Sequence, residues 1–433
     1  MKNRERFVCI MLLVLIIGQF PVFATEIMKP VEELSAPKYC GRLSGTEGNK
    51  LAEEYIAEQF REIGLAFLEG YEDYFQEFVQ PVRLMNQPPK MSIIEDTGEV
   101  IAFRYLKDFV ASVGPGMSID AETEAKGIVL KDISQLKTIS ETVAGKILLI
   151  PADVFKKNQG YIMKSIINAN KKPAGIILEA ELNRPFFPRN LTVSPSASQD
   201  PKILPLLFSI RKSQFEKLLV ACEKEHIIQM SADYEVKQVQ SNNVIGVVNG
   251  TDENWEKKKI FIIGAHIDGA GDNKNGTYNP SAQDNASGIA VLLACARELQ
   301  RMKEKLNSTY IFIAFNGEEQ GRYGSLHFVS ERFLSTEGMK MINLDNVGSE
   351  KDIPLLIETV PGQANKLQKA LLQNAEKMGI QAKANESRGS DHLSFAEKGI
   401  AAVNLIHPDN AFAHSPTDTI YHSFLLPIES IPV

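Results

Sequence analysis

The chain has 433 residues, of which 44% are hydrophobic and 23% are charged. This composition is ordinary for a globular protein, and the length favours two domains over one. The formal net charge of −7 argues against a nucleic-acid-binding protein, which would normally carry a basic patch. Nucleic acid is therefore not expected among its partners.

Residues 1–24 have the pattern of a signal peptide. A basic start precedes an apolar stretch at 7–20, which is shorter than a comfortable membrane span. The stretch ends at Val22-Phe23-Ala24, which offers small residues where a signal peptidase cuts. We expect a mature chain that begins near Thr25, works in the periplasm or is secreted, and has no membrane span after cleavage. The alternative is an uncleaved membrane anchor.

The cysteines do not indicate thiolate chemistry. Cys9 lies in the signal segment, which leaves Cys40, Cys222 and Cys295 in the mature chain. An odd number without CxxC spacing supports neither a zinc–thiolate site nor a disulfide framework. Cys295 falls in a helical pattern and is expected to be a small buried apolar residue.

The first globular elements are predicted between residues 28 and 84. Residues 28–39 have the composition of a polar lead-in, and 41–46 form a loop. Apolar residues recur on one helical face over 47–63, and Gly64 follows as a C-cap would. Residues 71–84 are expected to be extended.

The texture of the sequence changes over 84–239, and we predict an inserted, smaller α+β or β-rich domain there. Short β-type runs alternate with helical pieces at 161–169 and 211–222. His226 is the only histidine in this block and is expected to be a surface residue. The predicted strands lie at 127–130, 146–150 and 174–178, and Pro-rich breaks lie at 88–89, 185–188 and 201–205.

The main domain is predicted over 25–83 and 240–433. Its near-continuous apolar runs are typical of strands covered on both faces. Because helical patterns separate these runs, we expect an α/β fold, a mostly parallel or mixed sheet sandwiched by helices. The predicted strands are 243–248, 260–263, 310–315, 341–344 and 401–406, and the predicted helices are 288–302, 324–334, 363–377 and 391–398.

Side chains that can bind a metal follow the predicted strands. In open α/β sheets, ligands bind at the carboxyl ends of the strands. Carboxylates and imidazoles without thiolates suit a catalytic zinc site. Each acid taken alone has a plainer interpretation as a solvated charge or a helix cap, but their order after successive apolar runs favours a metal site. The candidates are His266, Asp284, the pair Glu318-Glu319, Asp345 and His414.

The number of candidates indicates two metal ions, because five ligands exceed what one zinc with an open position needs. If Asp284 bridges two ions, each ion gains three protein ligands. Asp284 precedes the helix expected to start near Ser287, so Asn285 and Ser287 can cap that helix while Asp284 faces the site.

Adjacent Glu318 and Glu319 are not expected to play the same part. One can bind metal while the other takes a proton from the attacking water. Asp268, two residues after His266, is expected to accept the ring N–H of that histidine, as carboxylates behind metal ligands commonly do.

Several motifs together resemble the family 28 zinc aminopeptidases, which are co-catalytic di-zinc exopeptidases. They are GAHID, SAQDNASG, FNGEEQGRYGS, INLDNVG, SDH and HSPTDT, with GRLSGTEGN near the N-terminus. The resemblance spans most of 41–83 and 243–420. It implies peptide substrates, two zinc ions per chain and hydrolysis of N-terminal residues. The block at 84–239 resembles the protease-associated domain that many members carry, which is thought to shape substrate access.

The resemblance also implies a role for each candidate. His266 and Asp345 would hold one zinc, Glu319 and His414 the other, and Asp284 would bridge them. Glu318 is then the general base and acid, and Asp268 orients His266.

One departure concerns the residue before the last ligand, where several members have Tyr and this chain has Ala413. Tyr421 and Tyr323 are the nearest candidates in the sequence to supply a phenol. We expect instead that a zinc ion carries the oxyanion charge and that neither phenol is essential.

Ser390-Asp391-His392 does not indicate a serine hydrolase, because no GxSxG elbow precedes it and the three are neighbours in sequence. In the family this segment lines the substrate side. Asp391 and His392 are therefore candidate substrate contacts only.

Two other functions are compatible with the scaffold. Glutaminyl cyclases, which are acyltransferases, share it with one zinc. Catalytically silent receptor-like ectodomains share the two-domain plan but lose metal ligands, and none of the five is lost here. The sequence leaves open the preferred substrate residue and carboxypeptidase action.

Overall fold

The computed structural model describes residues 21–112, 117–180, 186, 192–193, 204–251, 259–331, 338–348, 353–408 and 411–420. The chain divides into two compact units. The first unit comprises Met1–Gln80, Val239–Asp272 and Tyr278–Val433, and the second comprises Pro81–Gln238 with Asn273–Thr277. Within the described residues, no helix is long and apolar enough to cross a bilayer. Most of the predicted signal segment, residues 1–20, and Tyr421 lie outside them.

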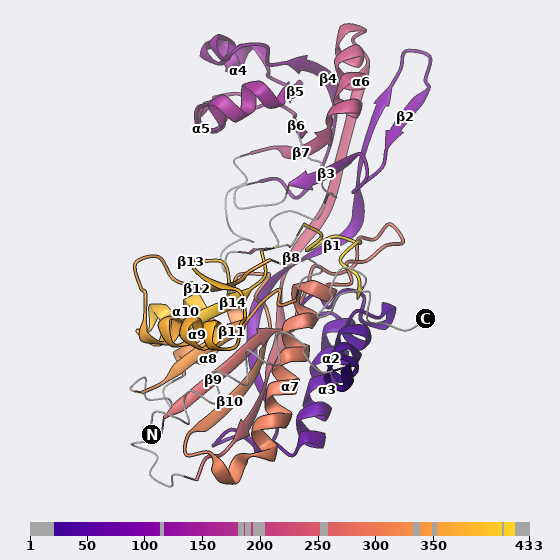
Figure 1. Ribbon diagram of the computed structural model, residues 1–433. Coiled ribbons are helices and arrows are strands. Elements are labelled where there is room, and N and C mark those ends of the chain that lie inside the picture. Colours follow the sequence, from indigo (N-terminus) through magenta and orange to yellow (C-terminus); the bar gives the residue numbers. More distant parts are fainter. Residues whose placement is uncertain are drawn as a thin grey trace. The chain divides into compact units, whose positions relative to one another are not determined.

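The first unit is built on a mixed sheet with the strand order β13-β12-β14-β11-β9-β10-β8 (Figure 1). The central strands β14, β11, β9 and β10 are parallel, whereas β8 is antiparallel to β10 and β12 is antiparallel to β14. The strands are β8 (Ile227–Val248), β9 (Ile260–His266), β10 (Thr309–Phe315), β11 (Lys340–Leu344), β12 (Leu355–Thr359), β13 (Ala382–Glu386) and β14 (Ala401–Ile406). The expected mostly parallel or mixed sheet is therefore confirmed.

Two apolar layers cover opposite faces of this sheet. Along β9, Phe261 and Ile263 belong to one layer while Ile260 and Ile262 belong to the other. Side chains of α2, α3, α7 and α9 join the first layer, and those of α8 and α10 join the second. Every residue of β9 and β10 is buried, which explains their near-continuous apolar sequences.

The helices of the first unit begin and end within a few residues of the predicted positions, apart from the first helix and the helix predicted at 324–334, whose predicted end lies outside the described residues. They are α2 (Pro21–Leu34), α3 (Glu47–Ile63), α7 (Ser287–Arg301), α8 (Tyr323–Ser330), α9 (Lys366–Lys377) and α10 (His392–Glu397), with 3-10 turns η1 (Pro37–Tyr39) and η5 (Lys303–Lys305). The α3 helix starts at Thr46, whose side chain accepts a hydrogen bond from the Asn49 N–H, and ends at Gly64 with a φ of 80°. Both ends match the predicted start and C-cap.

The prediction of a polar lead-in at 28–39 is wrong. The α2 helix occupies most of this stretch, and Ile27, Val31 and Leu34 are buried in the layer shared with α7. Their spacing of four and three residues places them on one helical face. Charged residues between them gave the stretch its polar composition.

The strands of the second unit follow the order β8-β4-β5-β6-β7-β3. The strands β4 to β7 are parallel, and β3 and β8 pair antiparallel at its ends. Its elements are β1 (Phe75–Ile94), β2 (Val100–Phe103), β3 (Phe109–Ser112), β4 (Asp120–Val129), β5 (Ile147–Ile150), β6 (Gly175–Ala180), β7 (Leu206–Arg211), η2 (Ile133–Thr138), α4 (Ile139–Thr142), α5 (Ala152–Asn168) and α6 (Lys212–Glu223). The chain enters this unit along β1 and leaves it along β8.

The bounds of the second unit differ by a few residues from the predicted insert at 84–239, and the segment 273–277 was not expected in it. Its likeness to a protease-associated domain stays a prediction. The expectation that His226 lies on the surface is wrong. Its side chain is buried, and its Nδ1 lies 3.9 Å from a carboxylate oxygen of Glu95.

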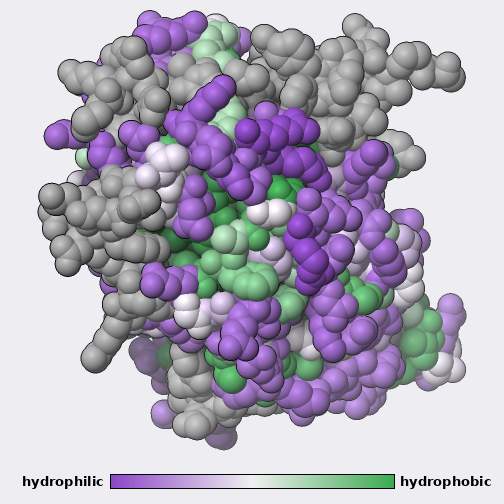
Figure 2. Space-filling model, turned by 90° about the horizontal axis from the view of Figure 1, so that it is seen from below, coloured by the Kyte–Doolittle hydropathy of each residue, from purple (hydrophilic) through white to green (hydrophobic). Residues whose placement is uncertain are grey.

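Apolar groups also reach the surface. Figure 2 shows hydrophobic residues gathered within a mostly hydrophilic face. The large apolar side chains that are exposed among the described residues are spread over different elements of both units, as Phe67, Val100, Tyr161 and Leu326 illustrate. The exposure of these single large side chains is normal and does not by itself identify a binding surface.

Candidate metal centre

The structure brings together all five predicted ligands in two groups that share Asp284. One group is His266, Asp284 and Asp345, and the other is Asp284, Glu319 and His414. His266 Nε2 lies 3.1 Å from Asp284 Oδ1, and His414 Nε2 lies 3.0 Å from Asp284 Oδ2. The two oxygens of one carboxylate therefore face different groups, as a bridging ligand requires.

The ligands are positioned by the carboxyl ends of neighbouring strands. His266 is the last residue of β9, and Asp345 directly follows β11. Glu319 follows β10, and His414 lies in the segment after β14 with a φ of 60°. Because β14, β11, β9 and β10 are parallel, their carboxyl ends meet at one edge of the sheet. Asp284 reaches the same place from η4 (Ala282–Ala286), the irregular turn before α7.

The turn that carries Asp284 is held by Asn285. The Asn285 side chain accepts the Gly288 N–H at 3.0 Å and donates to the Leu344 carbonyl at 2.8 Å. Asn285 therefore acts near the start of α7 as expected, and it also joins this turn to the end of β11. Ser287 does not cap the helix, because its hydroxyl donates to the Gln283 carbonyl.

The spacing of the ligand atoms fits a metal ion better than a hydrogen-bonded cluster. His266 Nε2 and Glu319 Oε1 are buried and form no hydrogen bond, although other ligand atoms lie within 3.0–3.5 Å of them. Two ligand atoms at a tetrahedral angle and about 2.0–2.2 Å from zinc are separated by roughly 3.3–3.6 Å. The lone pairs thus converge as in a coordination shell.

The charges of the site also favour a cation. Burial opposes the charged form of His266, but the carboxylates of Asp284 and Asp345 outweigh it and raise the pKa of the imidazole well above its usual range. Burial opposes ionisation of Asp284, but His414 and His266 hold the pKa of that carboxyl well below its usual range. A metal cation can replace the protons that the metal-free cluster attracts.

Glu318 and Glu319 are separated in role by their positions. Glu319 belongs to a ligand group, whereas Glu318 belongs to neither group among the described residues. Burial, and after it the negative charges of Asp391 and Asp345, raise the pKa of Glu318 well above its usual range against the attraction of His266. Glu318 is thus a carboxyl outside both ligand groups that holds its proton more tightly than usual.

Asp268 differs from the expected arrangement. The His266 Nδ1 lies 3.2 Å from the main-chain carbonyl of Asp268, nearer than the 3.7 Å to its carboxylate. The carboxylate instead accepts the main-chain N–H groups of Glu318 and Glu319, each at 3.1 Å. Burial raises the pKa of Asp268 to about 7. Asp268 therefore orients His266 through its main chain and fixes the Glu318–Glu319 turn through its side chain.

Asp418 was missed in the sequence, although it belongs to the HSPTDT motif that contains His414. Its buried carboxylate accepts the main-chain N–H of Gln283 at 2.8 Å and that of Asp284 at 3.1 Å. Burial raises the pKa of Asp418 to about 7. It fixes the main chain at the shared ligand.

The Ser390-Asp391-His392 segment forms no catalytic triad, since no hydrogen bond among the described residues joins the three. Ser390 accepts from Asn343, and His392 Nε2 lies 3.2 Å from the Ser387 carbonyl. Both Asp391 oxygens are buried without a hydrogen bond, and burial raises the pKa of this carboxyl to about 6. Whether Asp391 and His392 contact substrate stays a prediction.

Two phenols could replace the Tyr that is absent at Ala413, and one of them, Tyr421, lies outside the described residues. Tyr323 is the first residue of α8 and is half-buried.

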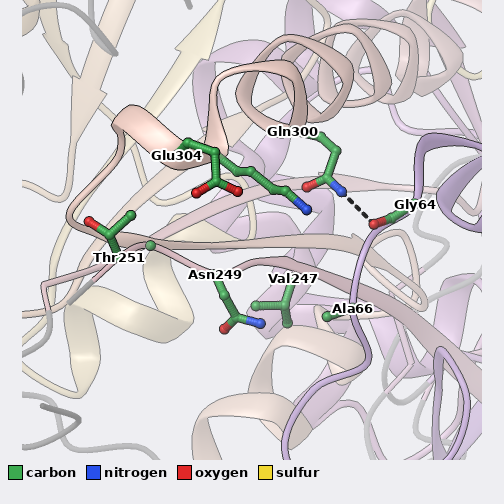
Figure 3. Close-up of a pocket in the computed structure, with 9 residues that line it drawn as sticks. Gly64, Ala66, Val247, Asn249, Thr251, Gln300 and Glu304 are labelled. Atoms are coloured by element: carbon green, nitrogen blue, oxygen red, sulfur yellow. Dashed lines mark hydrogen bonds between the residues drawn. The ribbon is translucent and has the colours of Figure 1, made fainter. Parts of the chain in front are cut away.

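A separate pocket contains none of the predicted ligands. It is lined by Gly64, Val247, Gln300 and Glu304 among others, and Gln300 donates to the Gly64 carbonyl at 2.6 Å (Figure 3). Gln300 and Glu304 lie at and beyond the carboxyl end of α7, whereas Asp284 precedes the amino end of that helix. The pocket is therefore distinct from the metal centre.

Comparison with known proteins connects this centre to a family. Residues 243–425 match peptidase family M28. The chain is 31% identical over 242 residues to aminopeptidase YwaD of Bacillus subtilis (strain 168), an alignment that covers 53% of this chain and 50% of that protein. A probable zinc metalloprotease of Pyrenophora tritici-repentis (strain Pt-1C-BFP) is 28% identical over 220 residues, covering 42% of this chain and 44% of that protein. The chain thus spans about half the length of the curated relatives it matches.

Solved structures agree in fold. The aminopeptidase from Aneurinibacillus sp. strain AM-1 has a TM-score of 0.64 at 22% identity and covers 95% of this chain and 92% of its own. BSAP, a zinc aminopeptidase from Bacillus subtilis, has a TM-score of 0.61 at 23% identity, with coverage of 92% and 90%. This likeness shows the shared fold. The segment that matches peptidase family M28, residues 243–425, contains all five candidate ligand residues.

Proposed function

We propose that the chain is an aminopeptidase that binds two zinc ions and hydrolyses N-terminal residues from peptides. The observation that carries the proposal is the pair of ligand groups sharing Asp284. The relatives named as aminopeptidases and zinc metalloproteases support the same activity. His266 and Asp345 would hold one zinc, Glu319 and His414 the other, and Asp284 would bridge both.

The chain's own residues would perform the proton transfers. Bound zinc supplies Lewis acidity and lowers the pKa of the attacking water. Glu318 accepts the proton of that water and then delivers it to the nitrogen of the leaving amine, so the carboxylate is regenerated. Its raised pKa suits both steps, because a weakly acidic carboxyl holds a proton until the amine takes it. Asp268 keeps this side chain in place through the Glu318 main-chain N–H.

Metal counting combined with a substrate panel tests the proposal. We expect close to two zinc ions per purified chain and chelator-sensitive release of the first residue from dipeptides and aminoacyl anilides. Peptides with an acetylated N-terminus are the matched control and should resist hydrolysis. One zinc per chain together with cyclisation of N-terminal glutamine would identify a glutaminyl cyclase instead. Release of C-terminal residues from the acetylated peptides would identify a carboxypeptidase.

We also propose that the chain is exported and that cleavage follows Ala24. The signal-peptide pattern of residues 1–24 supports this proposal. N-terminal sequencing of exported protein should begin near Thr25, and protein that still begins at Met1 would contradict it.

A further inference from the structure

Arg42, in the GRLSGTEGN segment, is a fully buried cation outside the two ligand groups. Burial lowers the pKa of its guanidinium to about 10, so it stays charged at neutral pH. Within the described part of the chain, no carboxylate lies at ion-pair distance from it. Burying a charged side chain costs free energy unless its donors form hydrogen bonds, so the hydrogen-bond partners of Arg42 indicate what this side chain does.

The partners of Arg42 are all main-chain carbonyls. Nε donates to Ile267 at 2.8 Å, and Nη2 donates to Ser281 at 2.8 Å. Nη1 donates to Leu34 at 2.5 Å and to Pro280 at 3.0 Å. The guanidinium is planar, and its donors form a rigid fork. It therefore holds three chain segments at fixed separations.

Two of these segments carry metal ligands. Ile267 directly follows His266, and Ser281 lies three residues before Asp284. The third segment ends α2, which packs against α7. The guanidinium thus lies between the main chain of one His ligand and the main chain that leads to the shared carboxylate.

The main chain around Arg42 strengthens the same connection. The Gly269 N–H donates to the Arg42 carbonyl at 3.2 Å, and the Gly271 N–H donates to the Gly41 carbonyl at 3.0 Å. A Cβ at Gly41 would lie 2.4 Å from the Asn279 carbonyl oxygen, and its φ is +73°. This close approach requires glycine at position 41. The Gly41-Arg42 pair therefore packs closely against the loop that follows β9.

Asp418 completes the support from the opposite side of the turn. Arg42 binds the carbonyls at 280 and 281, and Asp418 binds the N–H groups at 283 and 284. The main chain of the shared ligand is therefore held on both sides by buried polar side chains. Neither side chain hydrogen-bonds the carboxylate of Asp284 within the described residues.

We propose that Arg42 is a positioning residue of the metal centre, which sets the separation of His266 and Asp284 and so determines how tightly zinc is bound. The inference rests on the proposed function, because it assumes that these ligands hold zinc. If Arg42 only supported the fold, replacing it would lower the stability of the protein without a specific effect on metal binding. Zinc affinity measured at equal loss of stability distinguishes the two roles.

Full-length wild type, Arg42→Lys and Arg42→Ala would be compared by zinc competition with a chromophoric chelator and by the visible spectrum after cobalt substitution. Lysine keeps the charge but has a single nitrogen, which cannot reproduce the fork. We expect Arg42→Lys to fold, to bind zinc roughly 10- to 100-fold more weakly and to show an altered cobalt spectrum. If Arg42→Ala does not fold, Arg42→Lys still decides the question.

Leu299→Ala is the matched control. Leu299 is fully buried near the carboxyl end of α7, away from the ligand-bearing turns. At a similar loss of Tm, it should keep wild-type zinc affinity and cobalt spectrum. Wild-type zinc affinity in Arg42→Lys, or an equal loss of zinc affinity in Leu299→Ala, would overturn this inference but not the proposed function. A wild-type chain that binds no zinc would overturn the proposed function and this inference with it.

Discussion

Replacing Glu318 with Gln separates proton transfer from metal binding. The substitution keeps the size of the side chain and removes its ability to accept a proton. The Glu318 main-chain N–H donates to Asp268, and this bond does not involve the replaced group. Because Glu318 belongs to neither ligand group, we expect zinc content to stay near two per chain. Loss of general acid–base catalysis should lower kcat by roughly 100- to 10,000-fold, or about 2.7–5.4 kcal/mol in the barrier.

The same variant should make the metal-free chain more stable at alkaline pH. The pKa of Glu318 is raised in the folded state, so above its unfolded pKa the folded chain binds more protons and loses stability as pH rises. Gln cannot ionise and is spared this loss, which is about 1.4 kcal/mol for each unit of pKa difference. Thermal unfolding of chelator-treated protein near pH 8 should therefore give a higher Tm for Glu318→Gln than for wild type.

Glu319→Gln is the control, since Glu319 is a proposed ligand. It should lose zinc as well as activity. If Glu318→Gln is stripped of zinc while Glu319→Gln keeps it, the two roles are reversed. If Glu318→Gln keeps both zinc and wild-type kcat, the base lies elsewhere.

Three further outcomes are expected. Asp284→Ala should reduce zinc to well below one per chain, whereas Asp345→Ala should keep about one; equal metal content in the two would contradict a bridge. The pKa values of His266 and His414 are raised in the folded state, so the Tm of metal-free protein should fall as the pH rises above about 6.5, where the unfolded chain loses protons that the folded chain keeps. Zinc-loaded protein should not show this fall, because its ligands are already deprotonated. Replacing 84–239 by a Gly/Ser linker should keep zinc binding but change substrate preference, and loss of all metal would argue against a separable domain.

That the five candidate ligands lie close together could be predicted from the sequence, because their placement depends on a simple rule. His266 and Asp345 come directly after buried apolar runs, and parallel strands bring such positions to one edge of a sheet. The edge strand β13 was not predicted, since its sequence is polar and only its pairing with β12 makes it a strand. The role of Asp268 was only partly predicted, because sequence cannot tell a main-chain acceptor from a side-chain one.

Arg42 shows a different reason for failure. Three of its four partners lie more than two hundred residues away in sequence, and all four are carbonyls that every residue possesses. No residue type in the partner segments marks the contact. Asp418 escaped for the same reason, because its partners are main-chain N–H groups. When a side chain positions another segment by hydrogen bonds to its main chain, only the charged residue itself can be recognised in the sequence.

The extent of the domain that contains the candidate metal centre follows from these contacts. The family match begins at residue 243, yet the first unit also needs the segment before the second unit. Arg42 binds the turns beside His266 and Asp284, and the Glu53 carboxylate of α3 accepts the Asn316 side-chain N–H at 2.6 Å. Asn316 directly follows β10 and lies just before Glu318 and Glu319. The 243–425 segment thus supplies the ligands, while residues 27–63 fix the turns that carry them. The metal centre therefore belongs to a discontinuous domain whose two parts are separated in sequence by the second unit.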